Sequence, residues 1–387
     1  MAILAVRQDP RHPVAQPGRF RRSFVSATEW QLSSGILQGQ GGVARYYQTN
    51  RKTYAPVSHE ITAYFLGSLL YSHRISLETR PWDKSLLVSR ALDIASYLDE
   101  SAWHSQEATF PFEPIPEGQP AFAYFFDCGI ILRGLIAAWR TTQNPRFLSR
   151  AVETASAMSN DFVRPDRIDA ILQLPGKHPV SQGNRWSQAG GCYQLKAALG
   201  WRELAEATGQ PKWKQLYLDT LERCLATHRQ FLNAEAISAD AMDRLHAYCY
   251  FLEGLLPEAV DASDRGRRAS EALRWGIRLV NNALRDVSPV LLRSDVCAQL
   301  LRIRLYADGL GILPLDIDHA EEEVNLIYDF QAQHTDRRIN GGFYFGRESA
   351  GLRPFVNPVS TAFSIQALAL WEDHCHRRLQ ADPSTLI

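Results

Sequence analysis

Four carboxylates in this sequence could do acid and base chemistry together, because each lies in a segment with helical periodicity near small or aromatic residues: Glu60, Asp127, Glu253 and Asp295. Hydrolysis of a glycosidic bond needs two such groups, a protonated acid for the leaving oxygen and a second carboxylate as base or nucleophile. We therefore predict hydrolytic chemistry on a carbohydrate, with the acid and the base drawn from these four. Which two would pair stays open at this stage.

Simpler explanations exist for three of them. A helix dipole favours an acid such as Glu60 in a first turn, and Asp127 and Asp295 could be plain helix caps, the latter beside Ser294. The position that matches Glu60 in a second copy of the same motif holds Val359. A position that accepts valine in one copy is not acidic for the sake of the fold, which favours a functional role for Glu60.

One further helix places three polar side chains on one face. His246, Tyr250 and Glu253 follow one another at i, i+4 and i+7. Such a stripe is unfavourable to bury unless something polar meets it, so we count His246 and Tyr250 among the candidate catalytic residues. A satisfied structural network would explain the same spacing.

Several residues near these groups are predicted to bind substrate. Aromatic side chains in loops can stack on the apolar faces of sugar rings, although they often pack on the core instead. Arg293 could neutralise the carboxylate of a uronic acid while a tyrosine or histidine abstracts a proton, which is an alternative chemistry on the same scaffold. The predicted substrate-binding residues are His59, Tyr64, Tyr46, Trp186, Tyr248, Arg293, Gln299, Tyr344 and Asn357.

Helices must position all of these residues, because helical periodicity dominates the sequence and strand-like alternation is scarce. A helix rich in small residues is repeatedly followed by a break of Gly, Pro or Asn and then by a more charged amphipathic helix. We expect the small-residue helices to form an inner layer and the charged helices an outer wall. The expected pairs are 58–71 with 82–98, 125–140 with 147–158, 188–207 with 213–231, 245–259 with 267–284, 294–306 with 319–331, and 359–378 with 27–37.

The two ends of the chain carry variants of one motif, which indicates closure into a ring. Gly41-Gly42 precedes Val57 and Thr62 as Gly341-Gly342 precedes Val356 and Thr361, with the same Val-to-Thr spacing. The repeat period of roughly 50 to 65 residues is longer than the roughly 34 to 47 of common open solenoids. We therefore predict an all-α fold, a single-domain (α/α)6 toroid over residues 27–387 around a central pocket, preceded by an irregular arm over residues 1–26.

Composition limits the possible partners. Lysine plus arginine and aspartate plus glutamate are both 42, so no global field attracts nucleic acid or an anionic membrane. No apolar run approaches the roughly 20 residues needed to cross a bilayer, and the start does not resemble a secretory signal, so we expect a cytoplasmic protein. The six cysteines contain no Cys-x-x-Cys pair and are expected to be reduced core residues. No motif predicts a cofactor or a metal, and none predicts an oligomeric state.

An ordered series of short motifs supports a family comparison. These are Gly41-Gly42-Val43-Ala44-Arg45-Tyr46, Ser58-His59-Glu60-Ile61-Thr62-Ala63-Tyr64, Phe126-Asp127-Cys128-Gly129-Ile130, His246-Ala247-Tyr248, Glu253-Gly254-Leu255-Leu256, Cys297-Ala298-Gln299 and Gly341-Gly342-Phe343. The chain resembles, over roughly residues 30–371, the six-hairpin toroid proteins found with bacterial exopolysaccharide genes. Their layout is similar to that of glucuronyl C5-epimerase catalytic domains and six-hairpin glycosidases.

The resemblance implies a role in making or trimming a bacterial polysaccharide. It keeps two alternatives to hydrolysis open, namely a uronyl C5-epimerase or lyase and a non-catalytic protein that binds glycan or assists its assembly. The family pattern has a proline before the glutamate, where this chain has His59. Glu60 itself is present, but this departure weakens the transfer of a role to it, and a shared fold does not carry an activity with it.

Overall fold

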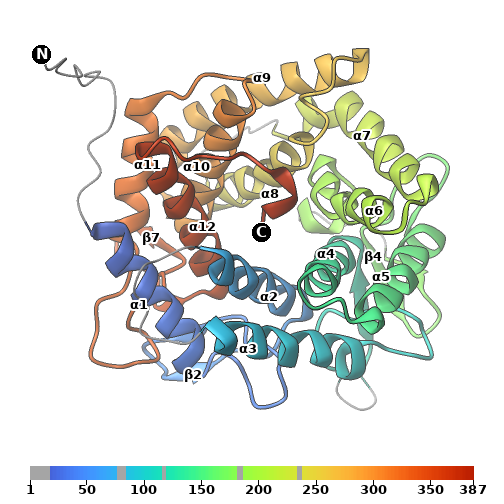
Figure 1. The fold of residues 1–387 in the computed structure, drawn as a ribbon, viewed down its shortest axis with the longest axis horizontal. Coiled ribbons are helices and arrows are strands. Elements are labelled where there is room, and N and C mark those ends of the chain that lie inside the picture. The colour runs from blue at the N-terminus through green and yellow to red at the C-terminus, as the bar shows by residue number, and fades with distance from the viewer. Residues whose placement is uncertain (1–17, 76–83, 116–118, 181–185, 233–237) are drawn as a thin grey trace, which may run out of the picture.

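Twelve α-helices form two concentric layers in the computed structural model, which describes residues 18–75, 84–115, 119–180, 186–232 and 238–387 (Figure 1). The inner layer consists of α2 (His59–Arg74), α4 (Phe125–Thr142), α6 (Leu195–Thr208), α8 (Ala239–Leu255), α10 (Ser294–Gly309) and α12 (Pro358–Cys375). The outer layer consists of α1 (Arg19–Ser33), α3 (Lys84–Tyr97), α5 (Pro145–Ala157), α7 (Pro211–Phe231), α9 (Asp264–Val287) and α11 (Ile317–Asp329).

The inner helices close into a ring. Each packs against the next along the chain, and α12 packs against α2, so no inner helix is left at an open edge. Helix α1 packs on α12 and supplies the outer helix of the sixth pair. The predicted all-α, single-domain (α/α)6 toroid is therefore confirmed, including the partner that the N-terminal segment provides.

The duplicated motif of units one and six adopts the same local structure twice. The backbone N–H of Val43 donates to Thr62 Oγ1 at 2.9 Å, and that of Phe343 donates to Thr361 Oγ1 at 3.0 Å. Gly41 and Gly341 have φ values of 97° and 89°, a left-handed conformation that favours glycine. The two motifs are thus structural copies, and Glu60 and Val359 occupy equivalent positions in them.

The predicted breaks between paired helices follow helix-capping chemistry. Asn144 accepts a hydrogen bond from the backbone N–H of Arg146 at 3.1 Å and caps α5, whose first residue is Pro145. Gly209, with φ of 68°, ends α6, and α7 begins at Pro211. Both turns are confirmed at the predicted residues.

Glycine lets the inner helices approach closely. A Cβ atom on Gly129 of α4 would lie 2.4 Å from the Cβ of Ala197 on α6, and one on Gly254 of α8 would lie 2.7 Å from the Leu195 side chain. Real Cβ atoms do not make such contacts, so only glycine fits. The small residues therefore mark the crowded inner layer, as the sequence predicts.

Three predicted boundaries were wrong. The part of the expected arm over residues 19–26 belongs to α1, because Phe20, Phe24 and Ala27 form an apolar face that packs into the core, whereas residues 1–17 lie outside the described residues. Helix α8 begins earlier than predicted, at Ala239, since Ser238 caps it. Helix α6 begins later, because the Gly190-Gly191 pair interrupts the segment before it.

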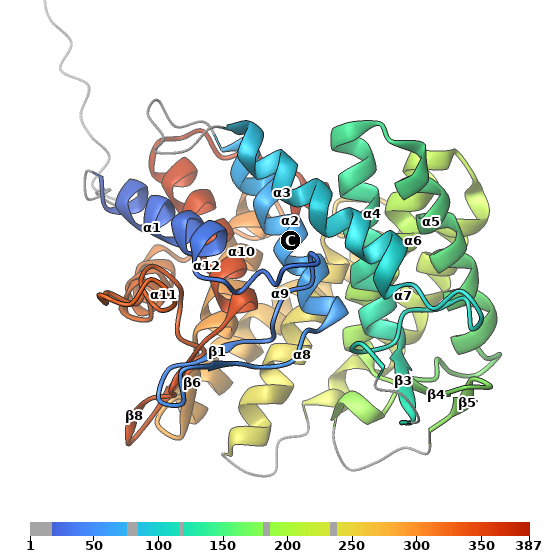
Figure 2. The ribbon, with the colours of Figure 1, turned by 90° about the horizontal axis from the view of Figure 1, so that it is seen from below.

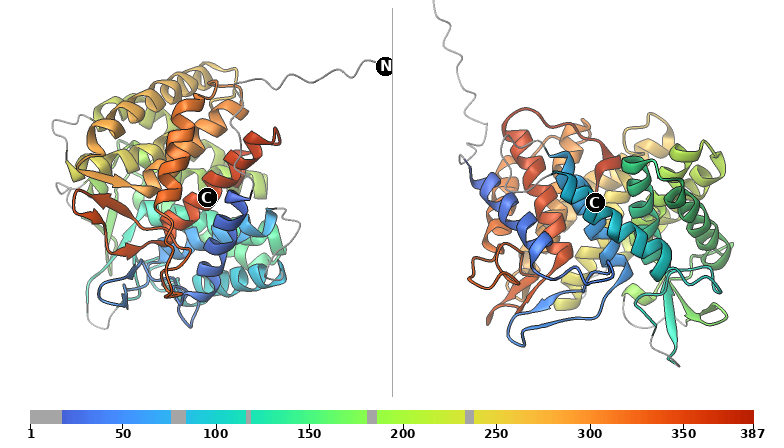
Figure 3. Two further views of the ribbon diagram at one scale, coloured as in Figure 1. Left: turned by 90° about the vertical axis from the view of Figure 1, so that its left-hand side faces the viewer. Right: turned by 60° about the horizontal axis from the view of Figure 1, so that its bottom comes forward.

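Three small antiparallel sheets lie at one end of the ring. They are β2 (Thr53–Tyr54), β1 (Tyr47–Gln48) and β9 (Phe355–Val356); β3 (Ala121–Tyr124), β4 (Ile171–Leu174) and β5 (His178–Pro179); and β6 (Leu291–Arg293), β7 (Gly346–Glu348) and β8 (Gly351–Leu352). Strands β3, β6 and β9 lead directly into α4, α10 and α12, so this end, called the strand-bearing end below, is where inner helices begin (Figures 2 and 3).

The last residues of the chain occupy the other end of the ring. Residues 382–387, called the tail below, bring the buried side chains of Leu386 and Ile387 between the inner helices. Arg133 donates to the carbonyl oxygen of Leu386 at 2.6 Å, and Lys196 donates to that of Ile387 at 2.8 Å. The tail therefore fills the centre of the ring, where Figure 1 places the C-terminus, on the side away from the strands.

Two general predictions have direct counterparts in the structure. The six cysteines are free thiols, and five of them are buried. None of the helices in the described part of the chain has the length and apolar character needed to cross a bilayer.

Candidate active site

Glu60 and Asp127 lie in the first turns of the neighbouring inner helices α2 and α4. Ser58 caps α2 through the backbone N–H of Ile61, which sets Glu60 in the second helical position, and strand β3 delivers Asp127 to the start of α4. Burial raises the pKa of Glu60 to about 7. Burial, followed by the charge of Glu60, raises the pKa of Asp127 well above its usual range. The two carboxyl groups are thus electrostatically coupled, and the pair retains a proton at neutral pH.

The two members of this pair differ in their access to solvent. Glu60 is partly exposed, although burial by the surrounding protein raises its pKa. Asp127 is buried, and its Oδ2 makes no hydrogen bond within the described residues. A buried carboxyl oxygen without a partner is unfavourable when ionised, which agrees with a protonated Asp127. Glu60 is therefore the member that a ligand can touch.

His246 on α8 is held as a neutral imidazole. Its Nδ1 donates to Gln299 Oε1 at 2.7 Å, in the orientation that the structure gives this amide. Burial, with the nearby charge of Arg293, lowers the pKa of His246 to about 4, because both oppose the imidazolium form. With the proton on Nδ1, the lone pair on Nε2 is free to accept a proton. The predicted residues His246 and Gln299 are thus brought together.

Arg293 is fully engaged with carboxylates. Its Nε and Nη2 donate to the two oxygens of Asp295 at 3.0 and 2.6 Å, and its Nη1 donates to Asp243 at 2.6 Å. Burial alone would raise the pKa of Asp295, but the charge of Arg293 outweighs it and the pKa is lowered. Asp295 is therefore ionised with both oxygens occupied. The prediction of Arg293 as a free cation for a substrate carboxylate is wrong.

Aromatic rings connect these groups across the barrel. The Tyr250 ring lies 4.6 Å from that of His246 and 4.7 Å from that of Phe126, centroid to centroid. It stacks on Tyr64 at 6.4 Å, and Tyr64 contacts Phe363 edge-on at 5.2 Å. After burial, the charge of Glu60 is the largest cause of the raised pKa of Tyr250, so this phenol lies near the acid pair as well as near His246.

Glu253 does not join the acid pair. It is fully buried in the last turns of α8, where it forms ion pairs with Arg302 and, at 3.0 Å, with Lys196 beside the tail. Burial lowers the pKa of Lys196 well below its usual range. Seven residues along a helix rise roughly 10 Å, so Glu253 shares a face with His246 but lies two turns away from it. The prediction that Glu253 meets the other carboxylates is therefore wrong.

Three predicted substrate-binding residues have structural partners instead. Tyr248 exchanges a hydrogen bond with His228 Nδ1 at 2.9 Å and faces the outer helices. His59 donates to the carbonyl oxygen of Pro111 at 2.6 Å, with its other nitrogen 3.2 Å from a tyrosine hydroxyl. Asn357 caps α12 by accepting two backbone N–H groups at 2.8 and 3.0 Å. These side chains form hydrogen bonds within the protein, so the prediction that they bind substrate is not supported.

Partly exposed aromatic residues line the strand-bearing end. Trp186 packs edge-on against Tyr193 at 5.1 Å, and Tyr193 contacts Phe126, the residue before Asp127, at 5.8 Å. Tyr46 packs on an aromatic of β9 at 4.9 Å, and Tyr344 is also partly exposed. The predicted stacking of Trp186, Tyr46 and Tyr344 on a sugar stays a prediction that this placement allows.

Sequence reasoning missed three residues of this site. Asp243 ties Arg293 in place, and Phe126 and Tyr193 enclose Asp127. Asp243 lies three positions before His246, on the same side of the helix, which is a signal that helical spacing contains. The described residues include no group of three or more His, Cys, Asp or Glu side chains placed to hold a metal ion.

Comparisons with known proteins agree on the fold. No family model matches the sequence, and no curated protein matches it. Among solved structures, the chain is similar to a cellobiose 2-epimerase from Spirochaeta thermophila, with 12% identity, a TM-score of 0.67, and coverage of 94% of this chain and 99% of that one.

Two hydrolase-type structures are similar as well. One is a possible GH105 family member from Salmonella enterica, with 12% identity, a TM-score of 0.61, and coverage of 94% and 96%. The other is an unsaturated glucuronyl hydrolase from Bacillus sp. GL1, with 13% identity, a TM-score of 0.59, and coverage of 90% and 96%. The structural neighbours are thus six-hairpin toroid proteins described as carbohydrate-active, and at these identities the likeness establishes the fold alone.

Proposed function

We propose that this protein hydrolyses a glycosidic bond of an uncharged sugar, with Glu60 as the proton donor. The observation that carries the proposal is the coupled pair of Glu60 and Asp127, in which the partly exposed member has a pKa of about 7. A general acid works best when its pKa lies near the working pH. The equivalent position in the duplicated motif is Val359, so the fold does not require an acid there.

The proposed reaction uses the groups at the strand-bearing end. Glu60 gives its proton to the glycosidic oxygen as the bond from that oxygen to the anomeric carbon breaks. Water forms the new bond to the anomeric carbon, and its proton passes to Nε2 of His246. Tyr250 contacts His246 and lies near Glu60, so it positions both groups. Asp127 stays protonated beside Glu60 and therefore adds no negative charge next to it.

The charges around the site favour an uncharged substrate over a uronic acid. Asp295 is ionised, whereas the one cation among these described residues, Arg293, is already bonded to the carboxylates of Asp295 and Asp243. A uronate would bring another negative charge without a free guanidinium to meet it. Uronyl C5-epimerisation and elimination are therefore less well supported than hydrolysis.

Epimerisation of a neutral sugar is a second candidate. It is favoured by the neutral His246, whose free Nε2 could abstract a proton beside a carbonyl group while Glu60 protonates the carbonyl oxygen. The structural likeness to a cellobiose 2-epimerase also makes this reaction worth testing. From the sequence resemblance alone, we further propose that the substrate derives from a bacterial polysaccharide and that the protein is cytoplasmic.

The test is a screen of neutral oligosaccharides in ¹⁸O-labelled water, followed by comparison of Glu60→Gln with Glu29→Gln. Glu29 is an exposed carboxylate on α1 and serves as a matched control. We expect a product with one ¹⁸O atom, a loss of roughly 10²- to 10⁴-fold in kcat/KM for Glu60→Gln, and no change for Glu29→Gln.

Other results would point elsewhere. If the same screen in D₂O gave deuterium in an intact sugar, and the screen in ¹⁸O-labelled water gave no cleavage, epimerisation would replace hydrolysis. Binding of oligosaccharides by the wild-type protein, with no product from any of them, would support a non-catalytic glycan-binding role. Full activity of Glu60→Gln would remove Glu60 from the mechanism.

A further inference from the structure

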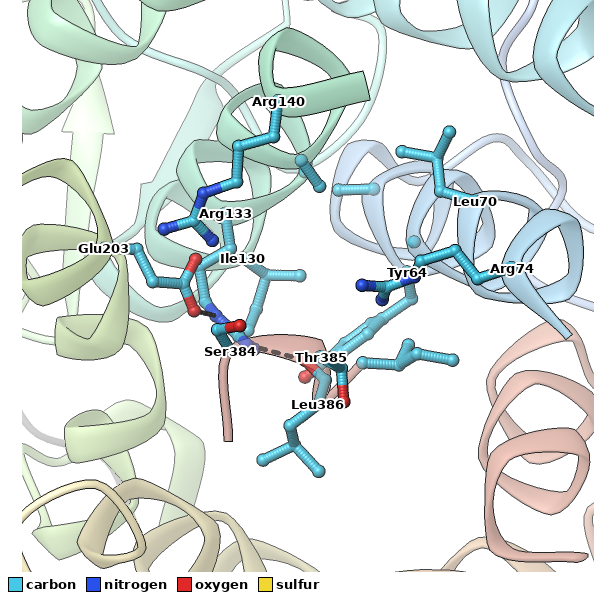
Figure 4. A pocket seen from close by; sticks show the side chains of 15 residues that line it. Tyr64, Leu70, Arg74, Ile130, Arg133, Arg140, Glu203, Ser384, Thr385 and Leu386 are labelled. Carbon is cyan, nitrogen blue, oxygen red and sulfur yellow. Dashed lines mark hydrogen bonds and ion pairs between the residues drawn. The ribbon is translucent and has the colours of Figure 1, made fainter. Parts of the chain in front are cut away.

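A small pocket lies at the end of the ring away from Glu60, between the later turns of α2 and α4 and the tail (Figure 4). Its volume is about 60 Å³. A single water needs roughly 10 to 15 Å³ of such space, so the pocket has room for several waters, about the size of a phosphate or carboxylate group. The residues with polar side chains that border it are Tyr64, Arg74, Arg133, Arg140, Glu203, Ser384 and Thr385.

Small residues on the two helices create the space. Ala63 and Gly67 of α2 face Gly134 and Ala137 of α4 across the pocket. A Cβ atom on Gly134 would lie 3.3 Å from that of Ala63, so the helices are already in close contact there. The pocket lies between this contact and the tail. Larger side chains at these small-residue positions would fill it.

The side chains that border the pocket include three guanidinium groups and one carboxylate, that of Glu203. Arg133 is committed to the fold, since it donates to Glu203 at 2.8 Å and to the tail at 2.6 Å. Arg140 has one partner, Glu206, at 3.2 Å in a solvent-accessible pair, which is a weak type of interaction. Arg74, whose guanidinium carbon lies 5.8 Å from the centre of the Tyr71 ring, has no carboxylate side chain as a partner within the described residues and extends from α2 toward the tail (Figure 4). Two guanidinium groups therefore retain donors for an added anion.

Helix dipoles do not account for this arrangement. Arg74 and Arg140 lie in the last turns of their helices, where a cation is favourable on any helix. That effect explains neither why both border the same hollow nor why Arg133, in the middle of α4, joins them. An oxyanion bound between two guanidinium groups would form several charge-assisted hydrogen bonds, which are among the stronger polar contacts in proteins.

We propose that this pocket binds a small oxyanion, either phosphate or the carboxylate of a small metabolite, through Arg74 and Arg140. The anion bridges α2, α4 and the tail and balances the positive charge at this end of the ring. The site is separate from Glu60 and His246, so its occupancy does not depend on the proposed hydrolysis and is measurable without any sugar.

The test is calorimetric titration of the full chain with inorganic phosphate and, separately, with acetate, each at constant ionic strength set with sodium chloride. We expect saturable binding of at least one of the two, with affinity at least tenfold weaker in Arg74→Gln and in Arg140→Gln. Arg74 is exposed and Arg140 is partly exposed, so both variants should fold, which circular dichroism checks. Arg90→Gln, an exposed arginine on α3, is the control with unchanged affinity.

The outcomes separate clearly. Binding of phosphate alone or of acetate alone supports the proposal and identifies the source of the oxyanion. Absence of saturable binding for both, or wild-type affinity in both Arg74→Gln and Arg140→Gln, overturns it. Loss of activity toward sugars in Glu60→Gln has no bearing on either result.

Discussion

The proposed chemistry of this protein depends on how two carboxyl groups share protons. Among the described residues, no cation lowers the pKa of Glu60 or Asp127, and burial raises the pKa of each. Asp295 shows the opposite case, because Arg293 lowers its pKa despite complete burial. Asp295 is thus ionised, whereas Glu60 and Asp127 can carry protons near neutral pH. Carboxyl groups that serve different functions in one site are expected to differ in pKa in this way.

The raised pKa of Glu60 predicts that the difference in stability between the wild type and Glu60→Gln depends on pH. The native state holds the Glu60 proton up to about pH 7, whereas the unfolded chain releases it near the ordinary glutamate pKa of 4.5. Since the native state binds the extra proton between these values, wild-type stability falls as pH rises through this window. Glu60→Gln lacks this loss.

Thermal unfolding measured from pH 4 to pH 8 tests this difference. The Tm of Glu60→Gln minus that of the wild type should increase between about pH 4.5 and pH 7 and level off above. Glu29→Gln should track the wild type throughout. A Tm difference independent of pH would mean that Glu60 ionises normally in the folded protein.

At the scale of the helices, the spacing of small residues determines where the acids stand. Asp127 lies two residues before Gly129, where α4 and α6 are so close that an added Cβ would lie 2.4 Å from Ala197 Cβ. The helix cannot slide along its neighbour without opening this contact, so the glycine fixes the position of the carboxyl group.

Gly129→Ala should therefore destabilise the protein. Its new Cβ would lie 2.4 Å from Ala197 Cβ and 2.7 Å from a backbone oxygen of Ala197, and overpacking of this kind costs about 1 to 3 kcal/mol. Gly67→Ala is the matched control, since its Cβ would lie an ordinary 3.6 Å from Ile387 and alanine favours the helix. Urea unfolding compares the two; equal stability of both variants would argue against the close contact.

Much of this element-level arrangement could be predicted from sequence. Periodicity, capping residues and the matching Gly-Gly motifs are local signals, and they predicted the helix pairs and the outer role of α1. The starts of α6 and α8 were wrong because Gly190-Gly191 and the Ser238 cap were not weighed against the periodic pattern. Errors of this kind arise where short-range backbone chemistry overrides a hydrophobic repeat.

At the scale of the whole molecule, ring closure decides which residues meet. It brings Glu60 of α2 near Asp127 of α4, and it brings His246 of α8 into contact with Gln299 of α10. It also separates Glu253 into a buried network with Lys196 and Arg302 beside the tail. A sequence pattern indicates which face of a helix a residue occupies, but its depth along the barrel depends on the relative shift of neighbouring helices, which no local signal records.

The same limit explains the other corrections. Arg293 was predicted to be free because Asp295 could be explained as a helix cap and because its second partner, Asp243, lies on α8, 50 residues away in the sequence. Tyr248 was placed at the site because it is close in sequence to His246 and Tyr250, although an offset of two residues turns it to the outer layer. The anion pocket has no sequence motif at all, since its arginines meet only through the packing of α2, α4 and the tail.

The central claim is that the folded ring couples Glu60 to Asp127, and titration of the side-chain carboxyl carbons by ¹³C NMR tests it most directly. We predict that the Glu60 resonance titrates near pH 7 in the wild type and that Asp127 titrates at lower pH in Glu60→Gln, since a neighbouring negative charge is removed. A Glu60 resonance that titrates near 4.5, with Asp127 unaffected by the substitution, would contradict the account.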